Sequence, residues 1–482
     1  MHLFLSAASG NAGFVPALER FNNVINGFIW GPAMCMVFVL VGIWLSIRTK
    51  WFQLFQAKLW WRATGASLFT DKRVRKTADQ KAISQFQALS TALAATVGTG
   101  NIAGVATAIV SGGPGAVFWM WVSAFFGMIT KFSEIALSMK YRYRNEKGEW
   151  QGGPMVFIER GMGKRFKWLA ALFAIFATLA SFGIGSAVQA NSAAGALEEA
   201  FGFRPVNVGL VIAAVTAVVI IGGIQRIGKV TEILVPFMAI LYTVGAVALI
   251  AMNAQHLGQA FGAIFAGAFR LQAVGGGVLG FTIAQAMRFG IARGVFTNEA
   301  GLGSSSIAHA ASDTKEPVKQ AMWGVFEVFA DTLVICTLTA LAVLTTGVHE
   351  AGLLDAAGAP LSGAALTSAA FASGFGRAGP VFLSVAMCLF AFATLVGWSY
   401  YGERTYEYLF GPKTTVVYKI MFLCTIVLGT ATKLDLVWNI SDTLNGLMAI
   451  PNLIGVVSLS GTVAALTKDY LRRCSITGAV LG

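Results

Sequence analysis

Apolar stretches of membrane-spanning length alternate with short polar segments along almost the whole chain. A helix that crosses a bilayer needs about 20 mostly apolar residues. Such stretches lie near residues 26–46, 84–111, 114–139, 167–196, 206–223, 230–252, 276–300, 320–346, 379–402, 415–431 and 436–466. We therefore predict an all-α polytopic membrane protein with eleven transmembrane helices, the first of which follows an amphipathic lead.

Two of these stretches contain too much glycine and too many polar residues to be ordinary spans. The stretch at 84–111 carries Gly98, Thr99, Gly100, Asn101 and Gly104 near its middle. The stretch at 276–300 carries Gly280, Gly290, Gly294 and Asn298. Each opens a group of five spans, and because five is odd the second group runs inverted relative to the first. Glycine-interrupted spans at matching positions of two inverted halves indicate a transporter binding site, whereas close helix packing is the other use of such glycines.

A helix that unwinds inside the membrane can bind ions. Unwinding frees backbone N–H and C=O groups, which are tolerated only around a cavity or in contact with protein. The N–H groups at the start of a half-helix can hold an anion, helped by the helix dipole, and the freed carbonyl oxygens suit a hard cation such as Na⁺. One break can therefore bind a carboxylate and a cation together, as coupled uptake of an amino acid requires.

The composition excludes several classes of protein. Of the 482 residues, 56% are hydrophobic and 12% are charged, against roughly 25% charged in soluble domains. The net charge of +13 does not indicate a nucleic-acid-binding protein, because too few polar residues remain to build a polar exterior. The apolar excess also excludes a disordered chain.

The basic residues predict the orientation in the plasma (inner) membrane. The loop between the first and second spans is strongly basic, with Arg48, Lys50, Lys58, Arg62, Lys72, Arg73, Arg75, Lys76 and Lys81. The opposite side holds Arg20, Arg204, Arg270, Arg377 and Lys433. By the positive-inside rule, the N-terminus lies outside and the C-terminus lies in the cytoplasm. The predicted units are a lead, extra helix and basic loop at 1–82, a first repeat at 83–252, a second repeat at 253–467 and a cytoplasmic tail at 468–482.

Nothing in the sequence indicates an enzyme. It has no Walker A lysine, so ATP-driven transport through this chain is not expected. The four histidines lie far apart and suggest neither a metal site nor a Ser–His–Asp system. The five cysteines also lie far apart, and their spacing suggests no disulfide framework.

Four long and unusual strings carry a resemblance to a known family. They are VGTGNIAG (97–104), GGPGAVFWMWVSAFFGMITKFSE (112–134), GVFTNEAGLGSSSIAHA (294–310) and VGWSYYGER (396–404). With them the chain resembles the alanine/glycine:cation symporters, also called sodium:alanine symporters, from Asn23 to about Arg472. That family belongs to the amino acid–polyamine–organocation superfamily. The resemblance implies the leucine-transporter-type 5+5 inverted repeat with one extra N-terminal helix, so core helices 1 to 10 are the second to eleventh spans.

The resemblance also implies where substrate and ion bind. It places Thr96, Gly98, Thr99, Gly100, Asn101, Gln189, Thr394 and Trp398 at the amino acid, and Ala94, Val97, Ala391 and Thr394 at Na⁺. In this arrangement the amides near Thr99 and Gly100 hold the substrate carboxylate, and the Thr96 carbonyl lies near its amine. Leu395 departs from the pattern, because some relatives have a sodium-binding serine at this position.

Two of these residues have simpler alternative roles. Trp398 shares a helix face with Thr394, four residues earlier, and its bulk at the cavity would leave room only for a small side chain. It could equally belong to an interfacial aromatic belt. Gln189 lies in an apolar span, where hydrogen bonding between helices is the alternative to binding substrate.

Charged residues inside the predicted spans are costly and usually functional. Lys131 and Glu134 are expected to form a structural pair at i, i+3. Glu327 and Asp331 have no partner nearby in sequence. They are expected to be neutralised across the bundle by Arg288 and Arg293, with a proton or second-cation role as the alternative.

Two further polar residues, Glu299 and His309, are expected at a gate or on a solvated face near the cytoplasmic end. No role is assigned to Asp442 on the last span.

The sequence thus predicts a secondary active symporter that imports alanine or glycine with Na⁺ by alternating access, with both held at broken core helices 1 and 6. The alternatives are a proton-coupled or glutamine-transporting member of the same fold and, less favoured, a channel or membrane sensor. The expected partners are a small amino acid, Na⁺ and the lipid bilayer, with no nucleic acid and no cofactor.

Overall fold

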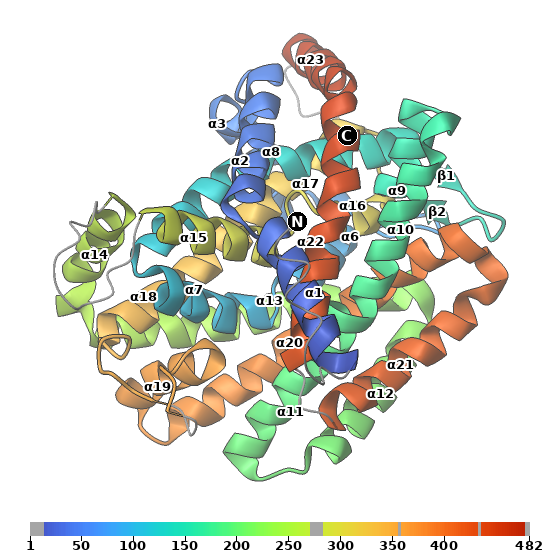
Figure 1. The fold of residues 1–482 in the computed structure, drawn as a ribbon. Coiled ribbons are helices and arrows are strands. Elements are labelled where there is room, and N and C mark those ends of the chain that lie inside the picture. The colour runs from blue at the N-terminus through green and yellow to red at the C-terminus, as the bar shows by residue number, and fades with distance from the viewer. Residues whose placement is uncertain (1–13, 270–282, 355–357, 432–434, 478–482) are drawn as a thin grey trace, which may run out of the picture.

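The computed structural model describes residues 14–269, 283–354, 358–431 and 435–477, and it is mostly helical (Figure 1). Gly280, Arg270, Lys433 and the two ends of the chain, which entered the predictions above, lie outside the described residues.

The helices follow one another in this order. The first half contains α1 (Phe14–Ile29), α2 (Pro32–Arg48), α3 (Phe52–Phe55), α4 (Ala57–Ala63), α5 (Ser67–Thr70), α6 (Gln85–Thr96), α7 (Val105–Gly112), α8 (Gly115–Tyr141), α9 (Pro154–Phe157), α10 (Lys167–Phe182), α11 (Val188–Phe201), α12 (Pro205–Ile221) and α13 (Gly223–Met252). The second half contains α14 (Leu257–Phe269), α15 (Ile283–Asn298), α16 (Ser305–Ala310), α17 (Pro317–Val328), α18 (Thr337–Thr346), α19 (Gly363–Phe375), α20 (Ala378–Phe410), α21 (Thr415–Ala431), α22 (Asp435–Ser458) and α23 (Ser460–Thr477).

Shorter elements join these helices. The π-helical turns are η2 (Gly100–Gly104), η3 (Ile158–Met162), η5 (Gly183–Ala187) and η7 (Phe329–Cys336). The 3₁₀ turns are η1 (Lys72–Arg75), η4 (Lys164–Phe166), η6 (Ala254–His256) and η8 (Pro412–Thr414). An antiparallel hairpin of β1 (Tyr143–Arg144) and β2 (Trp150–Gln151) follows α8.

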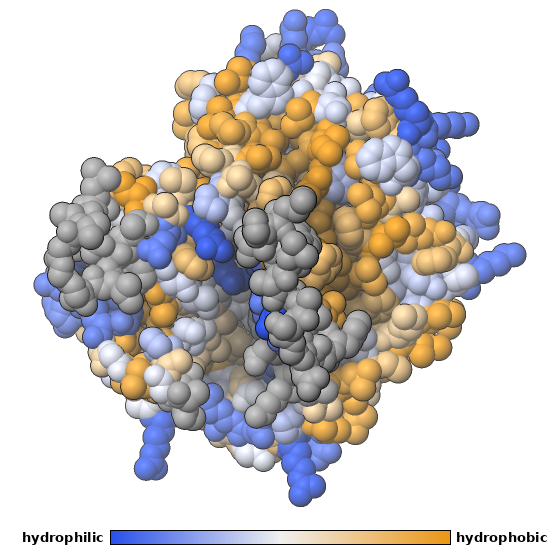
Figure 2. Space-filling view, in the orientation of Figure 1, coloured by the Kyte–Doolittle hydropathy of each residue, from blue (hydrophilic) through white to orange (hydrophobic). Residues whose placement is uncertain are grey.

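The helices confirm a multi-pass membrane protein. Among the described residues, eight helical segments are long and apolar enough to cross a membrane, or nine when the bent pair α6 and α7 counts as one span. The apolar helix α12 has 17 residues and is shorter than these. Figure 2 shows a broad hydrophobic expanse between hydrophilic residues at the top and at the lower edge of the molecule. An exterior of this kind suits lipid rather than water.

The packing sorts the helices into two groups, with the N-terminal helices beside them. The long helix α8 packs along α15 and α17, whereas α20 packs along α10 and α11, and α12 packs on α21 (Figure 1). The first two helices lie against both groups. Helix α2 packs on α8, and α1 packs on α22, which itself packs on α10. Helix α6 touches α13, α16 and α20, so it runs between the groups.

Local signals in the sequence explain where α6 begins and how it is held. Ser84 Oγ accepts a hydrogen bond from the Gln87 backbone N–H at 3.2 Å, and Gln87 Oε1 accepts one from the Ser84 N–H at 3.1 Å. This reciprocal capping box satisfies two N–H groups that the first turn leaves without partners. The start of the first broken span is therefore fixed by its own sequence.

Glycines allow α8 and its neighbours to pack with their backbones nearly in contact. A Cβ atom on Gly290 would overlap with the carbonyl oxygen of Ala116, and one on Gly294 would lie 3.2 Å from Ser123 Oγ. Both glycines lie inside the continuous helix α15. For these two glycines the second of the two predicted uses, close helix packing, is therefore confirmed, and neither marks a break in the span.

Substitution of Gly115 tests this close packing. A Cβ atom there would overlap with the backbone nitrogen of Ala268, and backbone atoms cannot rotate away. We expect Gly115→Ala to lower the free energy of unfolding by about 1–3 kcal/mol, as overpacking usually does, measured by thermal denaturation in detergent. Gly262→Ala is the matched control, since no atom of the residues that the structure describes lies within 4 Å of its Cβ position. Equal stability of the two variants would contradict the close contact.

Candidate functional site

The first broken helix forms at the VGTGN string. Helix α6 ends at Thr96, and the helix that resumes at Gly100 makes an angle of 51° with it. Asn101 Oδ1 accepts a hydrogen bond from the freed N–H of Gly98 at 2.9 Å. A side chain three residues ahead thus satisfies a backbone group that the break leaves without a helical partner. The break predicted for this span is present in the structure.

A second break separates α15 from α16. Between them the backbone takes positive φ values at Glu299 (55°), Gly301 (94°) and Gly303 (82°), a conformation that suits glycine. Asn298 Oδ1 accepts a hydrogen bond from the N–H of Ala300 at 3.0 Å. The interruption predicted for this span is therefore present at residues 299–304, directly after Asn298.

A buried cation lies beside the second break. Lys131 Nζ lies 2.6 Å from Glu327 Oε1 and donates to the carbonyl oxygen of Asn298 at 2.5 Å. Both charged side chains are fully buried. His309 Nε2 lies 3.2 Å from the other carboxylate oxygen of Glu327. Lys131 therefore joins α8 to α17 and to the last residue of α15.

This arrangement corrects the predicted pairing of Lys131 with Glu134. Glu134 instead accepts hydrogen bonds from the Gly301 N–H at 2.9 Å and from Asn452 Nδ2 at 2.6 Å. A three-residue spacing brings two side chains to the same helix face, but here each finds a partner on another helix. Glu134 thereby holds the second break to α22.

The role predicted for Arg288 and Arg293 is also wrong, and burial excludes the solvated face predicted for Glu299 and His309, whereas the gate stays a prediction. Glu327 is neutralised by Lys131, and Arg288 Nε donates instead to the Trp30 carbonyl oxygen at 3.2 Å. Glu299 and His309 are 3% and 0% exposed, so neither lies on a solvated face.

Asp331 connects the two breaks through neutral donors. Its Oδ1 accepts from Asn101 Nδ2 at 2.7 Å, and its Oδ2 accepts from Thr332 Oγ1 at 2.8 Å. Asn298 Nδ2 donates to the same Thr332 hydroxyl at 3.0 Å. Among the described residues no Lys, Arg or His lies within ion-pair distance of this carboxylate. A continuous hydrogen-bonded chain therefore runs from the first break through η7 to the second.

Several predicted substrate residues come together at the first break. A Cβ atom on Gly98 would lie 2.5 Å from Thr394 Oγ1 and 3.7 Å from Gln189 Oε1. Thr99 Oγ1 donates to Gln189 Oε1 at 3.0 Å, while Gln189 Nε2 donates to the Ile184 carbonyl oxygen at 3.1 Å. Residues from α6–η2, α11 and α20 therefore converge, although they are far apart in sequence.

The predicted sodium residues lie on the two helices that meet here. Ala94, Val97 and Ala391 are all buried. A Cβ atom on Gly397 would lie 2.7 Å from the backbone nitrogen of Ala95, so α20 packs directly against the last turn of α6. The backbones of α6 and α20 are therefore close together near the residues predicted to bind Na⁺ on each helix.

Trp398 lies inside the protein. Its side chain is 2% exposed, and its ring contacts that of Tyr401 with centroids 5.6 Å apart. The absence of a side chain at Gly185 makes room for it, since a Cβ atom there would lie 2.6 Å from Trp398 Cβ. An interfacial aromatic belt faces lipid and water, so that alternative for Trp398 is wrong.

A cavity of about 600 Å³ opens beside the first break. Thr99 and Gly100 line it, together with polar and charged residues of α11, α15 and α22: Asn191, Glu199, Arg293 and Asp442. The ring of Phe296 also lines it and covers Gly100, whose Cβ position lies 3.2 Å from that ring. Gln189, Thr394 and Trp398 do not line it. The Thr99–Gln189 hydrogen bond therefore lies at the floor of the cavity.

The residues that line the outer part of this cavity were not among those predicted to bind the substrate. Arg293 and Phe296 lie one turn apart on α15, and the Arg293 guanidinium lies 5.3 Å from the centre of the Phe296 ring. The i, i+3 spacing of a cation and an aromatic residue before a break was the available signal. Asp442 reaches the cavity from α22, and no pattern in the sequence connects it to α15.

The sequence matches known transporters over nearly its whole length. The sodium:alanine symporter family matches residues 15–477. The chain is 46% identical over 451 residues to the sodium/alanine symporter AgcS of Methanococcus maripaludis, covering 93% of this chain and 96% of that protein. It is 39% identical over 459 residues to the probable sodium/glutamine symporter GlnT of Bacillus subtilis, covering 95% and 91%.

A solved structure has a similar fold. The crystal structure of MhsT in complex with L-phenylalanine superposes with a TM-score of 0.54 and 12% identity, covering 81% of this chain and 99% of that one. At this identity the likeness extends to the fold alone.

Removal of the buried cation tests the role of the ion pair. Lys131→Met leaves the carboxylate of Glu327 buried without its lysine, so we expect a loss of about 3–5 kcal/mol in the free energy of unfolding, measured by thermal denaturation in detergent. Lys131→Met/Glu327→Gln removes both charges and should recover most of that loss. Lys58→Met, at an exposed position, should change stability by less than about 0.5 kcal/mol. A Lys131→Met protein as stable as the Lys58→Met protein would refute the stabilising role of the Lys131–Glu327 ion pair.

Proposed function

Because this chain belongs to the sodium:alanine symporter family, we propose that it imports alanine or glycine together with Na⁺. The observation that carries the proposal is the broken helix at Val97–Asn101, where α6–η2, α11 and α20 converge at the floor of a cavity of about 600 Å³. The family and its named relatives are transporters, not enzymes.

The amino acid is held by the break. Its carboxylate accepts hydrogen bonds from the amides near Thr99 and Gly100, at the positive end of the resumed helix, and its amine lies near the Thr96 carbonyl. Asn101 supports this geometry because it already satisfies the Gly98 N–H at 2.9 Å. Gln189, on α11, accepts a hydrogen bond from the Thr99 hydroxyl at 3.0 Å, directly beside the break.

The sodium ion lies between α6 and α20. The carbonyl oxygens of Ala94, Val97 and Ala391 and the hydroxyl of Thr394 supply four ligands. The close approach of these helices, with Gly397 against Ala95 and Gly98 against Thr394, supports this placement. Leu395 has no oxygen in its side chain, so a fifth ligand comes from elsewhere, such as the bound substrate.

The chain crosses the membrane eleven times in this proposal. One extra helix precedes two inverted five-helix repeats of the leucine-transporter type, at 83–252 and 253–467, with the N-terminus outside and the C-terminus in the cytoplasm. The bundle of α6–α7, α8, α15–α16 and α17–α18 rocks against a scaffold built on α10–α11 and α20–α21. The tight packing of α8 with α15 and α17 supports their movement as one body.

The ion gradient supplies enough free energy for accumulation. One charge moved through 100 mV releases about 2.3 kcal/mol, and a tenfold concentration gradient adds about 1.4 kcal/mol. Together one Na⁺ can drive roughly a 500-fold accumulation of alanine.

One observation favours a second candidate, proton coupling. Asp331 is buried and is hydrogen-bonded by the neutral donors Asn101 and Thr332. A carboxylate in this setting can take up and release a proton as the bundle moves. Uptake driven by a pH gradient in the absence of Na⁺ would establish this candidate and overturn sodium coupling.

Removal of one sodium ligand tests the coupling. In proteoliposomes we expect alanine uptake only with an inward Na⁺ gradient. We expect Thr394→Val to raise the Na⁺ concentration for half-maximal uptake about tenfold or more, since a polar contact to a charge contributes about 1.5–3 kcal/mol. Thr405→Val, on the same helix and hydrogen-bonded to Thr178 at 2.9 Å, should leave the Na⁺ dependence unchanged. Alanine uptake by the wild-type protein that is the same with and without a Na⁺ gradient would exclude the proposed coupling.

Trimming Trp398 tests the substrate size limit. If its indole limits the space available to the substrate side chain, Trp398→Ala should admit glutamine, which the related GlnT is named for, while uptake of alanine weakens. Competition against labelled alanine by a panel of amino acids measures this. Trp168→Ala, an exposed tryptophan, is the control. An unchanged preference for alanine and glycine in Trp398→Ala would remove Trp398 from the pocket.

A further inference from the structure

A second cavity, separate from the one at the first break, lies where α8 ends. It has a volume of about 710 Å³ and is formed by the end of α8, the start of the β1–β2 hairpin and the segment that leads into α10. Its charged lining consists of Lys140, Arg142, Arg160, Lys164 and Glu159. The proposed transport mechanism uses none of these residues.

The basic residues in the lining of this cavity outnumber its one carboxylate by four to one. Among the described residues, none of Lys140, Arg142, Arg160 and Lys164 forms an ion pair. The single acidic residue, Glu159, is already engaged, because it lies 3.9 Å from Lys167 Nζ and accepts a hydrogen bond from the Tyr408 hydroxyl at 2.6 Å. The cavity therefore presents an excess of cations that suits an anion.

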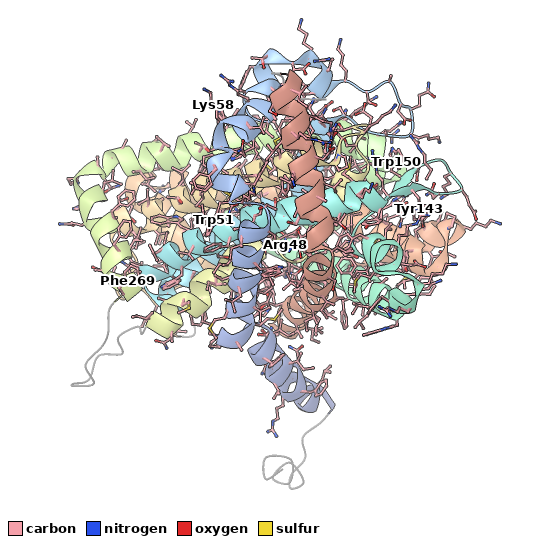
Figure 3. All side chains as sticks on the ribbon, turned by 90° about the horizontal axis from the view of Figure 1, so that it is seen from above. Arg48, Trp51, Lys58, Tyr143, Trp150 and Phe269 are labelled. Atoms are coloured by element: carbon pink, nitrogen blue, oxygen red, sulfur yellow. The ribbon has the colours of Figure 1, made fainter. Side chains whose placement is uncertain are left out.

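Aromatic rings and carbonyl groups hold two of these cations in place. Tyr143 and Trp150 lie at the β1–β2 hairpin, on one side of the molecule (Figure 3). The Arg160 guanidinium lies 4.2 Å from the centre of the Tyr143 ring, and the Arg142 guanidinium lies 4.0 Å from that of Trp150. Arg142 also donates to the Ala310 carbonyl oxygen at 2.7 Å. Burial lowers the pKa of Arg142 to about 10, with the nearby Arg144 adding to the effect, so it remains charged at neutral pH. The two guanidinium groups are fixed before any ligand arrives.

An exposed apolar face of α10 begins beside this cavity. Trp168, Ile175 and Leu179 are 64%, 43% and 45% exposed, and their spacing of seven and four residues places them on one side of the helix. The first of them follows Lys164 by one turn. A ligand with a charged head and an apolar tail would contact both surfaces at once, whereas a free phosphate would have no use for the apolar face.

We propose that this cavity binds the phosphate headgroup of an anionic phospholipid, with the acyl chains lying along the exposed face of α10. The basic cavity and the apolar face meet at the start of a membrane-spanning helix, where a headgroup and its chains also meet. Basic pockets between helices at the cytoplasmic surface recognise lipid headgroups by this chemistry. The proposal does not depend on the transported substrate or on the coupling ion.

Native mass spectrometry of the delipidated full chain tests this proposal. Phosphatidylglycerol, or phosphatidylcholine with the same acyl chains, is added in increasing amounts and the bound lipid is counted. We expect the wild-type protein to bind phosphatidylglycerol at least about tenfold more tightly than phosphatidylcholine. Each basic residue near the anion contributes about fivefold in affinity, so Lys140→Gln/Arg160→Gln/Lys164→Gln should weaken that binding about 100-fold.

The matched control is Lys58→Gln/Arg62→Gln/Lys413→Gln, which removes the same charge outside the cavity and should bind phosphatidylglycerol as the wild type does. An equal loss in both triple variants would overturn the proposal, because binding would then depend only on total charge. Circular dichroism and the thermal unfolding midpoint confirm that both variants fold.

A second pair of measurements separates a lipid from a soluble phosphate. Trp168→Ser/Ile175→Ser should weaken binding of phosphatidylglycerol several-fold, and inorganic phosphate at millimolar concentration should not displace the lipid. Displacement by inorganic phosphate, or an unchanged affinity in this variant, would show that the cavity takes a soluble anion and would overturn the assignment to a phospholipid.

Discussion

A helix that unwinds inside a membrane must find new partners for its backbone, and much of the interior of this protein meets that constraint. In the hydrocarbon region no water is present to take the place of a lost helical hydrogen bond. The Gly98 N–H is satisfied by Asn101, and the Ala300 N–H by Asn298. The Gly301 N–H is satisfied by Glu134 from another helix. These side chains in turn determine which helices lie beside each break.

The partners of the two breaks belong to one connected interior. Asn101 donates a hydrogen bond to Asp331, and Asn298 donates one to the neighbouring Thr332, both on η7. Lys131 contacts the last residue of α15 and also Glu327, which lies one helical turn before Asp331. A displacement of one break therefore shifts the hydrogen-bond partners of the other. This connection gives a physical reason for treating α6–α7, α8, α15–α16 and α17–α18 as one mechanical unit.

Much of the fold and part of the site could be predicted from the sequence, and the failures have a common cause. Apolar runs of spanning length and the VGTGN string are local signals, so the spans and the first break were predictable. The position of the second break could not be predicted, because packing glycines such as Gly290 and Gly294 resemble glycines at a break, and only the backbone angles at Glu299 and Gly301 distinguish the two uses.

The predicted pairing of Lys131 with Glu134 failed because it relied on closeness in sequence, whereas the partners of both residues lie on distant segments. Lys131 and Glu327 are separated by 196 positions. Glu134 and Asn452 are separated by 318. The same distance hid Asp442 and Arg293, which line one cavity from α22 and α15.

That long separation has a consequence for how the chain is made. Lys131 is synthesised in the first third of the chain, whereas Glu327 follows 196 residues later. A lysine in hydrocarbon without a partner costs several kcal/mol. The half-made protein therefore has to keep α8 near water, near lipid headgroups or within the insertion machinery until α17 emerges. Because of this order of synthesis, α8 can be fully buried only after α17 in the second half of the chain has been made.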